Sequence, residues 1–478
     1  MFKQVTSLYL PGYARTLVYM LQSTEYQVEP YIKWIHRTKN FRAVSYRREL
    51  AKTKAAQGLL YALRLGILIE ILAGVALIIL GINKTIAGGI FFGAVVIVIY
   101  PFVWAYLLVV PLILGRYLVS KPQAQRDITT ASQIFKDHPA TKIAIAGSYG
   151  KTTMKELLLC VLSEKLNVAA TPANKNVSVS HAKFAKGLNR DEDLLIIEYG
   201  EGEPGDVKRY SELTHPNRGV ITGLAPAHLD KYKTLKAAGE DIFSLADYLN
   251  NKNVYVYEDS STKDFIKKPY HVFNQSGALG SKISDIKVGI DGTSFTLSKA
   301  KKSLKLKSGL IGRHQVAYLA FVAVLALDLG LSEEQVISGI AKTKPFEHRM
   351  QPYELNGAWI LDDTYNGNLE GIKAGTRLLA ELKAKRKVYI TPGLVEQGEE
   401  TEKVHLEIGN LIAKSEPDLV VLMKNSVTQY IEKGLKDEGY KNELQIIDDP
   451  LDFYVNLKHI VAGGDLVVMQ NDWPDNYV

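Results

Sequence analysis

The fold is decided by the stretch Lys142-Ile143-Ala144-Ile145-Ala146-Gly147-Ser148-Tyr149-Gly150-Lys151-Thr152-Thr153. An apolar run of β type leads into a turn with two glycines, and a helix-forming segment follows. This order lets backbone N–H groups and the positive end of a helix dipole converge on phosphate oxygens. A lysine at this place reaches the terminal phosphates, and the hydroxyl after it holds Mg²⁺. The stretch therefore predicts a binding site for a nucleoside triphosphate.

This loop departs from the standard P-loop pattern at one position. Ile145 stands where a glycine is usual, five residues before Gly150, so the loop is shorter. A GxxGK sequence alone also fits a tight strand-to-helix turn that binds no ligand. The apolar run before the loop and the helix-forming residues 154–159 after it favour nucleotide binding over that alternative. The residues expected to contact the nucleotide here are Gly147, Ser148, Gly150, Lys151, Thr152 and Thr153.

Length and composition describe a globular chain of several domains. The 478 residues suggest about three domains at ~150 residues each, and 46% hydrophobic residues supply sizeable cores. The one cysteine, Cys160, excludes an internal disulfide framework and fits a reducing compartment. Its position in an apolar helical pattern indicates a small core residue, not a catalytic one.

The first 57 residues carry the whole excess of positive charge. They hold ten Lys/Arg and three acidic residues, a difference that equals the net charge of +7 for the entire chain. Nucleic acid attracts such a segment, but the apolar stretches that follow favour anionic lipid as its partner and argue against nucleic acid. We therefore expect residues 1–57 to be a basic interfacial segment, with helices within Tyr9–Ser45 along the membrane surface. An ordinary solvated helix is the alternative.

Two apolar stretches come after the basic segment. Leu65–Ile82 contains one charged residue, Glu70, and Ile86–Leu114 contains none. Each meets or nearly meets the ~20 residues needed to cross a hydrocarbon core, and the three residues between them allow a hairpin turn. Lys and Arg flank both ends of the hairpin, so both ends are expected on the cytoplasmic side. The sequence thus predicts a two-pass helical transmembrane hairpin over residues 58–116, with a buried hairpin of a soluble domain as the alternative.

Beyond residue 137, strand-like runs alternate with helical patterns, which is typical of α/β domains with parallel sheets. A β-rich insert is expected over residues 253–306, and an amphipathic helix over 314–329. A linker divides this part into two predicted domains, an ATP-binding domain at 137–344 and a Rossmann-like domain at 345–478. Strands are predicted at 143–146, 193–199, 219–224, 358–361, 387–390, 419–422 and 466–469.

Several motifs in this part resemble those of the Mur ligases, the ATP-dependent enzymes that build the peptide of bacterial cell walls. The resemblance covers about residues 137–478 and begins with the family's short P-loop. Asp362–Asn368 is similar to the DDSYNANP segment of the MurF branch, which adds D-alanyl-D-alanine. The other matching segments are Thr171–Asn176 for TxxNxN, Glu198 for a Mg²⁺-binding glutamate, Ala227–Asp230 for AHL(D/E), Gly312–His314 for GxHN and His348–Met350 for the arginine that opens the C-terminal domain.

The resemblance implies a role for each matched residue. Lys151, His228 and Arg349 would act in catalysis. Thr152, Glu198 and His228 would hold Mg²⁺, a hard ion that keeps some of its waters. The remaining contacts to ATP would come from Asn174, His314, Arg349, Asp363 and Asn366.

The resemblance also implies the reaction, an ATP-dependent joining of a carboxylate and an amine in peptidoglycan precursor synthesis. The carboxylate attacks the γ-phosphate, and the amine then displaces phosphate from the acyl phosphate. The partners would be a cell-wall precursor that carries the carboxylate, an amine substrate and membrane lipid.

Three departures from the family pattern bear on the metal site and the substrates. Ala238–Ile242 lacks the lysine that the family often carbamylates to hold a second Mg²⁺, and residues 471–477 replace a KGSR-like segment. The hairpin stands in place of the domain that grips uridine diphosphate, so either a partner subunit supplies that binding or the acceptor is lipid-linked. The alternatives are a ligase or amidating subunit for lipid-linked precursors or another polymer, and an ATP-binding membrane scaffold without ligase activity.

Overall fold

A computed structural model of the chain describes residues 8–9, 12–24, 26–38, 41, 50–173, 175–225, 229–300, 302–365, 367–394 and 397–471. The chain divides into two compact units, Met1–Arg126 and Asp127–Val478. We call them unit 1 and unit 2. Each unit has a hydrophobic core of its own.

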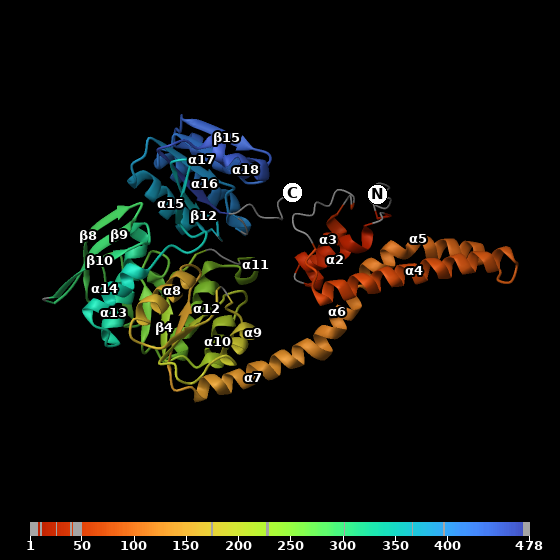
Figure 1. The fold of residues 1–478 in the computed structure, drawn as a ribbon, viewed down its shortest axis with the longest axis horizontal. Helices are drawn as coiled ribbons and strands as arrows, with labels where there is room; N and C mark the ends of the chain where they lie inside the picture. Colours follow the sequence, from red (N-terminus) through yellow and green to blue (C-terminus); the bar gives the residue numbers. More distant parts are fainter. Residues whose placement is uncertain are drawn as a thin grey trace. The chain divides into compact units, whose positions relative to one another are not determined.

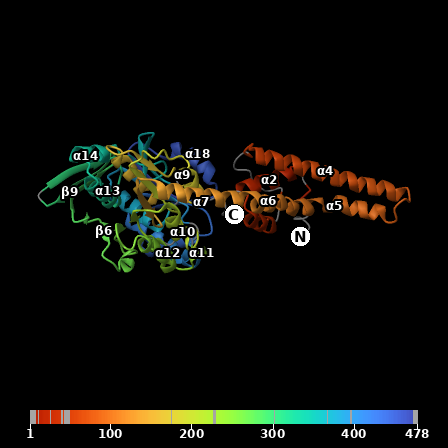
Figure 2. The same cartoon turned by 90° about the horizontal axis from the view of Figure 1, so that it is seen from below.

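Unit 1 is helical, and its longest part is an antiparallel hairpin of two helices, α4 and α5 (Figures 1 and 2). Glycines let the two backbones approach closely: a Cβ on Gly93 would lie 2.4 Å from the carbonyl oxygen of Gly74. Small residues at such crossings are typical of helices that pack inside a membrane. The helices of unit 1 are α2 Tyr13–Ser23, α3 Val28–Arg37, α4 Lys54–Ile82, α5 Gly89–Leu107 and α6 Val109–Gly115, and a short π-helical turn at Arg116–Ser120 leads into α7 Lys121–Asp137.

Two helical stretches are long and apolar enough to cross a membrane, judged by length and composition. They are Ala56–Ile82, with a mean hydropathy of 2.7, and Gly89–Asp137, whose most apolar window reaches 2.4. Only 6% of the first window and 22% of the second is buried. A core helix of a soluble protein is mostly buried. In the described part of the chain, these two helical stretches instead expose most of their apolar side chains.

The apolar faces of α2 and α3 pack on the hairpin. Leu17 and Tyr31 are fully buried in a cluster with residues of α4, α5 and α6. The Tyr31 hydroxyl donates to the carbonyl oxygen of Ala105 at 3.1 Å, close to the end of α5. Part of the basic segment therefore covers protein, and residues 42–49, where several of its cations lie, are outside the described part of the chain.

Unit 2 is built on two parallel sheets. The larger, which we call the main sheet, has the strand order β2-β3-β1-β4-β5-β6-β7, and only β7 pairs antiparallel. Helices α8 and α13 cover one face, while α10 and α12 cover the other. The predicted strands at 143–146, 193–199 and 219–224 are confirmed as β1 Thr141–Ala146, β3 Leu194–Glu198 and β4 Arg218–Ile221. The other elements here are β2 Val168–Ala170, α8 Lys151–Leu162, α9 Ser178–Ala185, α10 Asp206–Thr214, α11 Leu229–Tyr232, α12 Leu235–Tyr248 and α13 Val316–Asp328.

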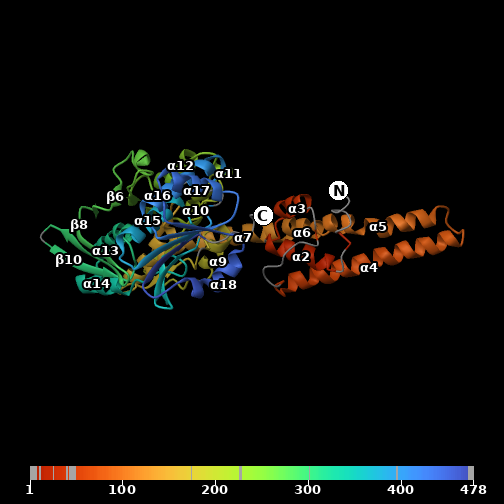
Figure 3. The same cartoon turned by 90° about the horizontal axis from the view of Figure 1, so that it is seen from above.

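The predicted β-rich insert is partly wrong. Its first strands, β5 Val254–Tyr257, β6 His271–Asn274 and β7 Gly277–Ala278, extend the main sheet because β5 pairs with β4 in parallel. Only the later strands form a separate antiparallel sheet, next to α14 (Figure 3). These are β8 Lys282–Gly289, β9 Gly292–Lys299 and β10 Lys302–Ser308, and α14 spans Glu333–Lys342.

Helix α13 also differs from the prediction, because it is not amphipathic. Every residue from Val316 to Ala326 is buried. The helix packs against α8, α14, β7 and β9, so it has protein on all sides. A helix that is apolar all round is a core helix.

The second sheet of unit 2, which we call the C-terminal sheet, has the order β11-β12-β16-β13-β14-β15. All its pairings are parallel except that of the edge strand β11 with β12. The four strands predicted in this region are confirmed. The elements are β11 Gln351–Leu355, β12 Ala358–Asp363, α15 Leu369–Glu381, β13 Arg386–Thr391, α16 Thr401–Lys414, β14 Leu419–Met423, α17 Thr428–Asp437, β15 Glu443–Ile447, α18 Pro450–Ile460 and β16 Asp465–Gln470.

Gly409 allows helices α16 and α17, which cover this sheet, to pack closely. A Cβ on Gly409 of α16 would lie 2.3 Å from the carbonyl oxygen of Ile431 in α17. We expect Gly409→Val to separate the two helices and to destabilise the protein by about 3 kcal/mol, the upper part of the overpacking range. Thermal unfolding measures the loss. Gly463→Ala is the control, because its Cβ meets only an ordinary contact at 3.8 Å; equal melting temperatures for the two variants would contradict this account.

Candidate nucleotide and metal site

The predicted phosphate loop joins β1 to α8 and requires glycine at both glycine positions. Gly147 has φ +145° and Gly150 has φ +76°, and a Cβ on Gly150 would lie 2.3 Å from the Tyr318 hydroxyl. The Ser148 N–H donates to the carbonyl oxygen of Gly223 at 2.8 Å, and the Thr222 hydroxyl donates to the carbonyl oxygen of Tyr149. The loop is thus fixed with the N-terminus of α8 at its end, an arrangement that suits phosphate.

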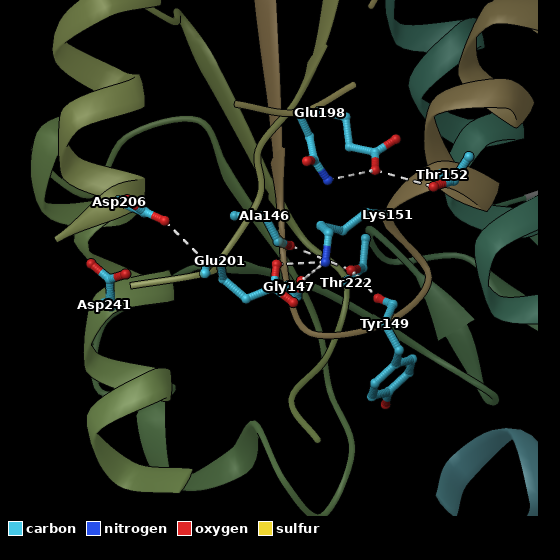
Figure 4. Close-up of polar contacts among 12 residues, drawn as sticks. Ala146, Gly147, Tyr149, Lys151, Thr152, Glu198, Glu201, Asp206, Thr222 and Asp241 are labelled. Atoms are coloured by element: carbon cyan, nitrogen blue, oxygen red, sulfur yellow. Dashed lines mark hydrogen bonds and ion pairs between the residues drawn. The ribbon is translucent and has the colours of Figure 1, made fainter. Parts of the chain in front are cut away.

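Lys151 points back into this loop and is paired there. Its Nζ lies 2.6 Å from Glu201 Oε2 and also donates to the carbonyl oxygen of Gly147 (Figure 4). Both side chains of the pair are largely buried, at 11% and 8% exposed. Sequence reasoning missed Glu201, because nothing local marks a carboxylate that lies 50 residues away along the chain. The segment after β3 therefore supplies a counter-ion for the lysine of the loop.

The segment that carries Glu201 is held firmly between β3 and α10. Asp206 Oδ2 accepts from the N–H groups of Gly202 and Glu203, both at 3.0 Å. Asp241 Oδ1 accepts from the Gly205 N–H at 3.0 Å, and its other oxygen accepts from the Tyr232 hydroxyl at 2.8 Å. Burial raises the pKa of Asp241. Asp241 lies in the stretch that lacks the family's lysine, and here it anchors the segment that carries Glu201.

The proposed metal ligands Thr152 and Glu198 lie together. The Thr152 hydroxyl donates to Glu198 Oε1 at 3.1 Å, and the Asn176 amide donates to the same oxygen at 3.3 Å (Figure 4). Glu198 is 2% exposed, and its other oxygen lies 3.2 Å from Nζ of the fully buried Lys155. A hydroxyl and a carboxylate are ligands that suit Mg²⁺. Among the described residues no group of three or more His, Cys, Asp or Glu could hold a metal ion by itself.

A cavity of ≈ 210 Å³ opens beside the loop, between the main sheet and the C-terminal sheet. It brings together five of the predicted residues, which come from both halves of unit 2. Three tyrosines at 149, 257 and 318, with Asp259 and Glu370, were not predicted, because they come from distant parts of the chain. The predicted residues that line the cavity are Gly150, Thr153, His314, Arg349 and Asp363.

Burial sets the protonation of two groups in this cavity. Burial, and after it the charge of Arg377, lowers the pKa of His314 to about 4, so the ring is neutral at pH 7. Burial raises the pKa of Asp363 to about 7, although the carboxylate accepts hydrogen bonds from the Gln470 amide and the Met350 N–H. The Arg349 guanidinium lies 4.6 Å from the centre of the Tyr365 ring. Three predicted residues, Asn174, His228 and Asn366, lie outside the described residues.

Comparison with known proteins agrees with this geometry. Residues 145–326 match the model of the Mur ligase middle domain. The chain carries a Mur ligase middle domain. The P-loop, Glu198 and His314 lie inside this Mur ligase middle domain, whereas Arg349 and Asp363 follow it.

Two similar proteins share one ligase name. The UDP-N-acetylmuramoyl-tripeptide--D-alanyl-D-alanine ligase of Escherichia coli (strain K12) is 28% identical over 323 residues, which are 62% of this chain and 70% of that protein. The ligase of the same name from Mycobacterium leprae (strain TN) is 26% identical over 364 residues, or 69% of this chain and 70% of that protein.

Solved structures show the same fold. MurF ligase from Thermotoga maritima in complex with ADP matches with a TM-score of 0.64 and 22% identity, over 73% of this chain and 80% of that one. MurF from Acinetobacter baumannii matches with a TM-score of 0.64 and 19% identity, over 73% and 77%. Unit 2 therefore has the Mur ligase fold, with the Mur ligase middle domain built on the main sheet.

The counter-ion of the P-loop lysine gives a first prediction for this Mur ligase middle domain. Because Glu201 places a negative charge where phosphates approach Lys151, we expect Glu201→Gln to bind ADP and ATP about 10-fold more tightly, a change of ~1.4 kcal/mol. Isothermal titration calorimetry measures the affinity. Glu203→Gln is the matched control, since Glu203 is exposed and pairs with Lys231. Weaker nucleotide binding by Glu201→Gln would mean that Glu201 helps to hold the nucleotide instead.

Proposed function

We propose that the protein is an ATP-dependent ligase that joins a carboxylate to an amine in peptidoglycan precursor synthesis, as its relatives' names describe for them. The observation that carries the proposal is the cavity beside the P-loop, because residues of the loop line it together with Arg349, which precedes β11, and Asp363, which ends β12. A site split between two halves of a protein lets substrate binding and closure occur together. We propose residues 137–344 and 345–478 as the two domains, with a hinge near Lys344–Glu347.

The proposed chemistry has two steps. An oxygen of the substrate carboxylate attacks the γ-phosphorus of ATP, so the bond to ADP breaks and an acyl phosphate forms. The amine then attacks the acyl carbon, phosphate leaves, and the amine loses a proton. Lys151 and the N–H groups of the loop stabilise the negative charge that moves during both steps. Arg349 adds a positive charge from the other side of the cavity.

Thr152, Glu198 and His228 are the residues proposed to hold Mg²⁺. When bound, the ion would neutralise charge on the phosphates and fix their geometry. Asp363 and His314, with Asn174 and Asn366, are proposed for the nucleotide. The neutral ring of His314 donates or accepts a hydrogen bond without adding charge to the cavity.

The metal assignment gives a second prediction. Glu198→Gln removes the charge of a proposed ligand, so we expect the Mg²⁺ concentration needed for half-maximal activity to rise by about 10-fold or more, in the range found when support for a metal is lost. His228→Ala should act in the same direction. Activity against Mg²⁺ concentration is the measurement, with Glu156→Gln as the control. A lower melting temperature with unchanged Mg²⁺ dependence would show that Glu198 is structural, through its contact with Lys155.

The apolar hairpin of unit 1 supports a location at the membrane. We propose that the hairpin crosses the cytoplasmic membrane twice and that the ligase faces the cytoplasm, because Lys and Arg flank both ends of the hairpin. An acceptor linked to a membrane lipid fits this place, and a partner subunit that supplies nucleotide-sugar binding fits it as well. The amine is proposed to be D-alanyl-D-alanine, the amine in the names of the relatives.

One experiment tests the proposed reaction directly. The full-length protein in detergent or nanodiscs receives ATP, Mg²⁺, D-alanyl-D-alanine and a set of wall precursors that are either free or lipid-linked. Mass spectrometry then detects ADP and the new amide. We expect both products with at least one precursor and neither with Lys151→Ala. Nucleotide binding without any amide would favour the alternative of an ATP-binding membrane scaffold.

A further inference from the structure

A second cavity lies at the opposite end of the main sheet from the P-loop. Its volume is ≈ 410 Å³, and it is lined by Lys136, residues 138–142, Asn217, Arg218 and Asn253. These residues precede or begin β1, β4 and β5, whereas the P-loop follows β1. A strand of six residues spans roughly 20 Å, and the two cavities share no lining residue. The second cavity is therefore separate from the nucleotide site.

Three cationic side chains from three different segments meet in this cavity. They are Lys136 in the last turn of α7, Lys142 in β1 and Arg218 at the start of β4. The lining contains no carboxylate. Burial, and after it the charges of Lys136 and Lys142, lowers the pKa of the neighbouring His215. The cavity is thus a concentrated positive site without an acidic partner in its wall.

Lys142 is the most informative of the three. It is 5% exposed, and its Nζ donates to the carbonyl oxygens of His138 at 3.0 Å and Ala140 at 3.1 Å. No ion pair joins it to a described acidic residue. A buried ammonium is costly unless an opposite charge accompanies it. Carbonyl groups use two of its three N–H donors, so one donor remains for a ligand. Burial lowers the pKa of Lys142, and a bound anion would favour its charged form.

The surrounding polar groups favour an oxyanion. One Arg218 N–H donates to the Tyr255 hydroxyl at 2.6 Å, and the rest of the guanidinium fork matches two oxygens of one ligand. The Glu192 carboxylate is held by His138 at 3.1 Å, and that of Asp137 accepts from the Gln133 amide at 2.8 Å. The Asn217 side-chain oxygen accepts from the Lys142 N–H at 2.8 Å, which fixes this wall of the cavity.

We propose that this cavity binds a phosphate group. Three cations suit a phosphate better than a carboxylate, because a phosphate carries up to two charges and more acceptor oxygens. The phosphate could belong to a soluble compound or to the headgroup of an anionic lipid, since α7 continues the chain from the apolar hairpin. The proposal concerns a site beyond the ligase reaction, and it does not depend on that reaction.

Inorganic phosphate is the probe for the first test. The full-length protein in phosphatidylcholine nanodiscs is titrated with phosphate at constant ionic strength, in a Lys151→Ala background that weakens phosphate binding at the P-loop. We expect saturable binding by calorimetry and a loss of about 10-fold in affinity for Arg218→Gln, because a bidentate, charge-assisted contact disappears. Lys252→Gln, an exposed lysine beside the cavity, is the matched control. Equal affinities for Arg218→Gln and Lys252→Gln would overturn the proposal.

A second arm separates the two sources of phosphate. Hydrogen exchange of residues 136–142 is compared in phosphatidylcholine nanodiscs, with and without phosphate, and in nanodiscs that contain phosphatidylglycerol. Protection by added phosphate indicates a soluble ligand, and protection by phosphatidylglycerol alone indicates a headgroup. Arg218→Lys keeps the charge and should keep part of the protection, which shows that the variants fold. No protection in either arm would overturn the proposal.

Discussion

Lys151→Ala is expected to lower ADP formation by at least ~10²-fold, the loss that follows when one preorganised electrostatic contact is removed from a site of charge transfer. The lysine stands at the start of α8, where its ammonium can move from Glu201 to the phosphates. Steady-state ADP release measures the effect. The fold should remain, because the helix keeps its glycine cap and its buried face.

The controls for Lys151→Ala follow from its surroundings. Lys208→Ala removes an exposed lysine of α10 and should leave activity unchanged. In the double variant Lys151→Ala/Glu201→Gln, the affinity gain expected for Glu201→Gln alone should shrink, since the two residues contact each other. Normal ADP formation by Lys151→Ala would refute the P-loop assignment.

Deletion of residues 1–116 is expected to have the second large effect. The truncated protein keeps α7 and all of unit 2, so it should fold and bind ATP. Its activity on a lipid-linked acceptor in vesicles should fall by on the order of 10²-fold, because tethering to the membrane raises the effective concentration of such an acceptor. Its activity on the same headgroup free in solution should change little.

The comparison of the two acceptors is the decisive measurement. Both rates are determined with the full-length and the truncated protein at equal ATP and Mg²⁺. Equal losses on both acceptors would mean that unit 1 supports the fold of unit 2 and does not supply proximity. A full-length protein that stays in solution without detergent or lipid would also contradict the membrane proposal.

Local patterns explain why much of the fold could be predicted. The P-loop, the strand that ends at Glu198 and the strands of the C-terminal sheet each occupy a short, continuous stretch with its own apolar run and turn residues. The cap of α14 is equally local: the Ser332 side chain accepts from the Gln335 N–H, and the Gln335 side chain accepts from the Ser332 N–H. Such local signals can be recognised in the sequence without knowledge of the tertiary structure.

The failures have a common physical cause in contacts between distant segments. Glu201 reaches Lys151 only because β3 lies beside β1, and three tyrosines meet in the cavity beside the P-loop only after the main sheet forms. The prediction assigned β5 to a separate insert, whereas β5 pairs with β4 in the main sheet. The local sequence does not show which strand will be its partner. Helix α13 is an exception to this cause. Its apolar run from Val316 to Leu327 already indicates a core helix, so the prediction of an amphipathic helix does not follow from the sequence.

The position of β16 has a consequence for the order in which the protein matures during synthesis. This strand, Asp465–Gln470, lies between β12 and β13 in the middle of the C-terminal sheet. The sheet cannot be completed until residue 470 has left the ribosome, because β16 joins β12 to β13. By that time the apolar hairpin has long been available for membrane insertion. The segment of the hairpin is therefore complete in a nascent chain well before the C-terminal sheet, and Asp363 of β12 gains its partner strand only after β16 has been made.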